Sequence, residues 1–161
     1  IRIVPALFAA VILATSTDLW QHSIHANSHI VSAALAASAL FCGLRWWATD
    51  QDRWLYAFAF LAAQGVTHHP LLAIGTPAYV VFVLAVDWRL LLEWRRLVAV
   101  VLALLLGHSP FLYLPLRAGA TAFGPSTDLD ALIGHATARG IRVNLFPFGL
   151  DEHPVRLRVF V

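Results

Sequence analysis

The sequence contains no lysine and no methionine, and its one cysteine is Cys42. A disulfide bond within the chain is therefore excluded. Only 12% of the residues are charged, against about 25% in an ordinary soluble domain. The basic residues are all arginines and are scattered along the chain rather than gathered into a patch. This distribution argues against a nucleic-acid-binding protein, and we expect no nucleic-acid partner.

Apolar residues dominate the composition of the chain. They make up 60% of the chain, and the mean hydropathy is +0.73. Several apolar runs approach the roughly 20 residues that a spanning helix needs. We predict an all-α, polytopic bundle of transmembrane helices over residues 1–109. A multi-pass integral membrane protein is expected, with the lipid bilayer as a partner, and its helices are predicted at about 3–15, 29–47, 54–66, 71–86 and 95–108.

Thr67-His68-His69-Pro70 interrupts the apolar sequence between the third and fourth predicted helices. Proline ends a helix, and ionisable groups at membrane depth are costly unless they face protein or a water-filled cavity. Two arrangements fit the pattern over 54–86, namely a tight helical hairpin and a single broken helix.

Between the predicted spans, loops that contain arginine alternate with loops that contain none. The segments 16–28 and 67–70 contain none, which places both on the outer side by the positive-inside rule. The opposite side is predicted to carry Arg2, Arg45, Arg53, Arg89, Arg95 and Arg96.

Residues 110–161 are predicted to form an extracytoplasmic loop region. Thr127 follows a Gly-Pro turn and is predicted to cap a helix that carries Asp130 in its first turn. Apolar residues then share one helical face, so we predict a short amphipathic helix at about 128–139. Within 16–28, Asp18 or Thr17 is predicted to cap another short helix.

Histidines supply most of the candidate chemistry. His22, His25 and His29 are spaced i, i+3, i+7, and three imidazoles can bind zinc. A wetted interfacial helix explains the spacing as well, so we predict no metal site and no cofactor. His22, His25, Asn27 and Tyr113 are predicted to line a polar cavity.

Three residues are candidates for binding a phosphate group. A guanidinium suits bidentate phosphate binding, and an imidazole can donate to a phosphate oxygen or move a proton. We therefore predict Arg117, His68 and His69 as donor-phosphate ligands.

These motifs resemble those of bacterial protein O-mannosyltransferase-like membrane proteins. The resemblance covers about residues 17–149 and rests on their order. The motifs are Trp20-Gln21-His22-Ser23-Ile24-His25-Ala26-Asn27, Leu44-Arg45-Trp46-Trp47, Gly65-Val66-Thr67-His68-His69, Phe111-Leu112-Tyr113-Leu114-Pro115-Leu116-Arg117-Ala118 and Arg139-Gly140.

The resemblance implies a GT-C-type glycosyltransferase in a bacterial plasma membrane. Such an enzyme transfers a sugar, with mannose the candidate, from a polyprenyl-phosphate donor to a protein or glycan acceptor on the outer face. Its catalytic aspartate is expected upstream of Ile1, because both ends of the chain suggest a fragment of a longer protein. Relatives often carry glutamate in place of Asn27 and an aromatic residue in place of His29.

Two alternatives have a different function. A transporter or channel component would use a histidine-lined polar path, and a non-catalytic membrane protein would bind lipid. A transporter should show paired broken helices in two related halves. The sequence shows one break and no internal repeat, which favours the enzyme.

Overall fold

The computed structural model describes residues 3–24, 28–117, 129–136 and 139. Within these residues the regular secondary structure is helical and includes no strand, which confirms the prediction of an all-α chain. The chain divides into two compact units, Ile1–Ser109 and Pro110–Val161.

The first unit contains every predicted span. Its helices are α1 (Ile3–Thr15), α2 (Thr17–Ile24), α3 (Ser28–Thr49), α4 (Asp52–His68), α5 (Thr76–Asp87) and α6 (Trp94–Gly107). Two 3-10 helices flank α5, namely η1 (Pro70–Gly75) and η2 (Trp88–Leu91).

Two of these helical segments are long and apolar enough to cross a membrane. They are α3 and the continuous run Pro70–Leu91, each of 22 residues, and α1 is apolar but shorter. In α1 every described side chain is exposed, so its apolar surface is not covered by the rest of the unit.

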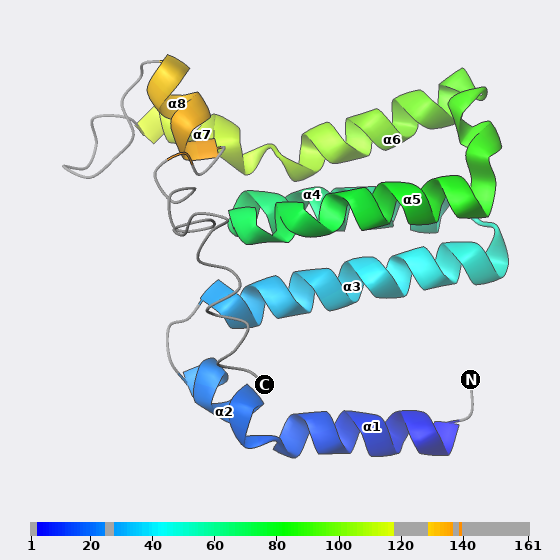
Figure 1. Ribbon diagram of the computed structural model, residues 1–161, viewed down its shortest axis with the longest axis vertical. Helices are drawn as coiled ribbons and strands as arrows, with labels where there is room; N and C mark the ends of the chain where they lie inside the picture. Colours follow the sequence, from blue (N-terminus) through cyan, green and yellow to red (C-terminus); the bar gives the residue numbers. More distant parts are fainter. Residues whose placement is uncertain (1–2, 25–27, 118–128, 137–138, 140–161) are drawn as a thin grey trace, which may run out of the picture. The chain divides into compact units, whose positions relative to one another are not determined.

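Helix α4 forms the centre of the first unit, with α3 and α6 packed along it (Figure 1). The buried core contains Trp46 from α3 and Leu55 and Phe58 from α4. The centroid of the Phe58 ring lies 5.2 Å from that of Tyr79 and 6.1 Å from that of Phe82, with the rings edge to face. Helix α5 therefore packs back against α4. Of the two arrangements that fit the sequence over 54–86, the structure adopts the hairpin.

A close approach of two backbones joins α4 to α6. A Cβ atom on Gly107 would lie 2.5 Å from the carbonyl oxygen of Phe60 and 2.6 Å from the Cβ of Ala63. Thr67 Oγ1 also donates to the carbonyl oxygen of Gly107 at 3.4 Å. Small residues at such crossings let helices pack closely where lipid surrounds them.

The cap of α2 differs from the prediction. The Leu19 backbone N–H donates to Ser16 Oγ at 3.3 Å, so Ser16 is the N-cap. Thr17 begins the helix and Asp18 lies in its first turn, so neither is the cap. A carboxylate one position inside the helix still interacts favourably with the helix dipole.

The second unit contains α7 (Pro110–Arg117) and α8 (Leu129–Ala136). Helix α7 lies where the sequence predicted a loop region, although proline is well tolerated at a first helical position. Helix α8 lies inside the predicted segment 128–139, and Thr127 falls outside the described residues. Arg139 donates to both oxygens of Asp130, and this hydrogen bond and charge lower the pKa of the Asp130 carboxyl below its ordinary value.

Replacing Gly107 with alanine should destabilise the first unit. The new methyl group would overlap backbone and Cβ atoms of α4, and overpacking of this kind costs about 1–3 kcal/mol. We expect a clear fall in Tm, measured by tryptophan fluorescence of the detergent-solubilised chain. Gly75→Ala is the matched control, because its Cβ would meet only Tyr79 ring atoms at 3.9 and 4.0 Å. Equal Tm values for the two variants would contradict the close approach.

Candidate functional site

Histidines from two helices and the turn after α4 meet at one end of the first unit. This histidine cluster consists of His29 near the start of α3, His68 at the end of α4, and His69 in the turn that follows. The His29 and His69 ring centroids lie 5.3 Å apart, with an interplanar angle of 41°. Side chains that are 40 positions apart in sequence are thereby brought together.

The geometry of His69 explains the break in the apolar sequence. Its backbone is extended, with φ −144° and ψ 110°, and its N–H donates to the carbonyl oxygen of Gly65. The Leu71 backbone N–H donates to His69 Nδ1 at 3.3 Å, so the imidazole caps η1. An accepting Nδ1 carries no proton, and the neutral ring then holds its proton on Nε2.

His68 makes a different contact. Its Nε2 lies 3.2 Å from the carbonyl oxygen of Ser28 and donates to it, since a carbonyl can only accept. The proton assignments of His68 and His69 follow from these hydrogen bonds. The two adjacent histidines therefore present different ring atoms to their surroundings, Nδ1 from His68 and Nε2–H from His69.

Helix α6 ends at the same end of the unit. The Thr67 hydroxyl donates to the Ala63 carbonyl oxygen of its own helix at 2.9 Å and shares this proton with the Gly107 carbonyl oxygen of α6, at 3.4 Å. His108 follows α6 directly and donates from Nδ1 to the carbonyl oxygen of Leu104 at 2.9 Å. The contact between Thr67 and Gly107 links the end of α4 to the end of α6, whereas the His108 hydrogen bond is local to the end of α6.

An apolar cavity of about 420 Å³ runs along α4 in the same unit. Its lining extends from Leu55 near the start of α4 to Val66 near its end, with further residues from α5, η2 and α6. Thr76 and His108 are the polar side chains of the lining apart from the Tyr79 hydroxyl. The volume falls within the range of small-molecule pockets.

The predicted site residues lie in different parts of the structure. It brings His68 and His69 together and adds His29 to them. His22 lies in α2, and His25 and Asn27 fall outside the described residues. Tyr113 and Arg117 lie in α7, which belongs to the second unit.

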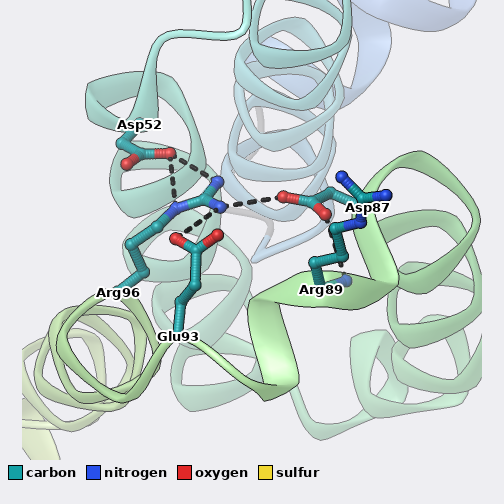
Figure 2. Close-up of polar contacts among 5 residues, drawn as sticks. All are labelled: Asp52, Asp87, Arg89, Glu93 and Arg96. Atoms are coloured by element: carbon teal, nitrogen blue, oxygen red, sulfur yellow. Dashed lines mark hydrogen bonds and ion pairs between the residues drawn. The ribbon is translucent and has the colours of Figure 1, made fainter.

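The opposite end of the first unit holds a cluster of charged residues around Arg96 (Figure 2). The Arg96 guanidinium donates to Asp52 at 2.7 Å, Asp87 at 2.8 Å and Glu93 at 3.2 Å. Asp87 also accepts from the Arg89 backbone N–H and thereby caps η2. One partly buried arginine therefore joins the starts of α4 and α6 to the end of α5.

Sequence reasoning missed this arginine cluster. The signal was present, because the predicted topology placed Arg96 on the same side as the loop that precedes α4. What the sequence does not show is that carboxylates 44 and 9 positions away converge on one guanidinium.

Together, the two apolar segments and the separation of histidines from arginines define a helical, membrane-associated chain. Residues 1–92 match the family model of the protein O-mannosyl-transferase TMEM260 N-terminal domain, and the chain belongs to this family. Its membrane location follows from the apolar helices and the family together. No curated protein and no solved structure matches the chain.

Replacing Arg96 with glutamine should destabilise the first unit by about 2 kcal/mol or more, because three carboxylates lose their charged donor. Arg96→Lys should recover part of the loss, since an ammonium cannot reproduce the planar donor geometry. Arg95→Gln is the matched control, because Arg95 is exposed and has no carboxylate partner among the described residues. Chemical denaturation in detergent measures the difference. Equal midpoints for Arg96→Gln and Arg95→Gln would show that the cluster contributes little.

Proposed function

We propose that this chain forms part of a membrane glycosyltransferase that transfers a sugar, with mannose the candidate, from a polyprenyl-phosphate donor. The acceptor is a protein or glycan on the outer face of the membrane. The observation that carries this proposal is the family match over residues 1–92. We also propose that the chain belongs to the GT-C superfamily, and this part of the proposal rests on the order of the motifs alone.

The histidine cluster is the proposed contact for the donor phosphate. Departure of a phosphate from the anomeric carbon needs hydrogen-bond donors or positive groups at its oxygens. His69 meets this need through Nε2–H, because its Nδ1 is engaged by the Leu71 N–H. His68 uses Nε2 on Ser28, so it reaches a phosphate as a donor only through a protonated Nδ1.

The side on which the cluster lies supports this role. In the first unit, the two connections that carry arginines meet at the Arg96 cluster, whereas the histidine cluster is at the other end of the same helices (Figure 1). By the positive-inside rule the arginine end faces the cytoplasm and the histidine end faces outward. This orientation matches a donor that is used on the outer face.

The apolar cavity along α4 supports a donor with an apolar chain. A polyprenyl tail needs an apolar surface next to the site that holds its phosphate. The cavity reaches the histidine end through Val66, Thr76 and His108 and is otherwise almost entirely apolar. Arg117, in the second unit, is also proposed to bind phosphate, on the strength of its motif.

His69→Asp separates the structural role of His69 from its proposed role in transfer. An aspartate oxygen can still accept from the Leu71 N–H, so stability should change little. It cannot donate to a phosphate, and loss of one such donor lowers kcat about 100-fold. Transfer from a polyprenyl-phospho-mannose to acceptor is measured in proteoliposomes, with Tm recorded in parallel.

His69→Ala completes this comparison. It removes both functions, so it should lose about 1 kcal/mol of stability as well as activity. Wild-type turnover in a well-folded His69→Asp protein would remove His69 from the donor site.

Arg117→Ala should abolish sugar transfer while leaving membrane insertion intact, because a small apolar residue cannot neutralise the donor phosphate. Arg139→Gln is the matched control in the same unit, since Arg139 pairs with Asp130. Insertion is checked by carbonate extraction and turnover by radiolabelled sugar transfer. Unchanged turnover in Arg117→Ala would exclude Arg117 from the site.

A further inference from the structure

At the arginine end of the first unit, the carboxylates and the arginines are unequally paired. Asp52, Asp87 and Glu93 all bind Arg96 (Figure 2). Other arginines at this end are exposed and make no ion pair with a carboxylate in the part of the chain that the structure describes. These are Arg45, Arg53, Arg89 and Arg95.

Exposed indole rings accompany these arginines. The exposed fractions are 65% for Trp47, 60% for Trp88 and 68% for Trp94. Three large apolar rings at one end of a bundle are unfavourable in water but are typical of the membrane interface.

Cation–π contacts hold several of the guanidinium groups. Arg45 and Arg53 lie 5.3 and 5.4 Å from the centroid of the Trp54 ring, and Arg95 lies 5.5 Å from that of Trp94. Such contacts leave the guanidinium N–H donors available, because the ring face accepts none of them as a conventional hydrogen bond. The donors can therefore bind an anion that approaches from outside the protein.

We propose that these residues form a binding surface for the headgroups of anionic phospholipids. The arginine–tryptophan surface consists of Arg45, Arg53, Arg89, Arg95, Trp47, Trp88 and Trp94. Guanidinium groups bind the phosphodiester and any further acidic group, and the indoles lie at the level of the headgroups beside the acyl chains. A surface-bound basic residue contributes about 1 kcal/mol toward anionic lipid.

The chemistry of this surface favours lipid over a soluble anion. A free phosphate ion would use the arginines but would gain nothing from three exposed indoles. Exposed apolar side chains also lie next to this surface, with Leu44 in α3 and Leu91 and Leu92 in and just after η2, at 54%, 57% and 71% exposed. Acyl chains cover such residues, whereas water does not. The proposal is independent of sugar transfer and of the histidine cluster.

The test titrates the full chain in uncharged detergent with dioleoylphosphatidylglycerol, dioleoylphosphatidylcholine or inorganic phosphate. Tryptophan fluorescence reports binding and thermal unfolding reports stabilisation. Phosphatidylglycerol should bind and raise Tm, while phosphatidylcholine and phosphate should have much smaller effects. The apparent Kd should weaken with added salt.

Two variants test the arginines. The double variant replaces Arg89 and Arg95 with glutamine, and the quadruple variant adds Arg45→Gln and Arg53→Gln. Each lost arginine should weaken phosphatidylglycerol binding roughly fivefold, the equivalent of about 1 kcal/mol. Arg139→Gln removes one positive charge outside this surface, and it should bind as the wild type does. The double variant retains both Trp54 contacts, so it tests the surface even where the quadruple variant fails to fold.

Three outcomes would overturn the proposal. They are equal binding of the two lipids by the wild type, an equal effect of inorganic phosphate, and unchanged phosphatidylglycerol binding by a folded double variant. A loss of sugar transfer without a change in lipid binding would concern the proposed function alone.

Discussion

The guanidinium of Arg96 is the polar contact on which the first unit depends most. It binds carboxylates from the start of α4, the end of α5 and the segment before α6, and it is only partly exposed. A charge in such a position is costly unless each of its donors finds a partner. Because three carboxylates satisfy it together, the ends of three helices are held in one arrangement. That arrangement also withdraws acidic groups from the neighbouring arginines.

The packing of α4 imposes a second constraint. Between its two polar ends the helix has few polar side chains, so its position depends on shape. Gly107 allows the α6 backbone to touch that of α4, and Phe58 fills the space toward α5. Where lipid surrounds a bundle, close packing replaces much of the hydrophobic driving force that operates in water. The cavity beside Phe58 is a place where this packing is incomplete, and its lining is almost entirely apolar.

Much of the helical architecture could be predicted from the sequence. Long apolar runs show where α3 and α4 lie, because helix formation is governed by local pattern. The break at His69 was visible too, and the alternation of the arginines favoured a hairpin, but the local sequence pattern left a broken helix open. That choice depends on contacts of Phe58 with Tyr79 and Phe82, which no local pattern records. Helix α7 was missed because its two prolines and its position beyond the last predicted span suggested a loop.

The candidate site shows the same limit. His68 and His69 attract attention as an interruption in apolar sequence, whereas the contribution of His29 emerges only when the starts and ends of helices are brought together. The Ser16 cap was missed for a smaller reason, since three adjacent residues can all cap a helix and only the backbone geometry selects one. The residue types therefore indicate chemistry, and tertiary contacts decide which atoms are available for it.

His69 illustrates how this availability is set. A free imidazole exchanges its proton between two nitrogens and turns about its side-chain bonds. At the start of η1 the Leu71 N–H occupies Nδ1, which places the neutral ring's proton on Nε2 and restricts its direction. The cap that ends the apolar run thus also prepares a hydrogen-bond donor before any ligand arrives. Preorganised donors act on developing charge without reorganisation at the moment of reaction. The irregular backbone between α4 and η1 is therefore the physical link between the break in the sequence and the proposed binding of the donor phosphate.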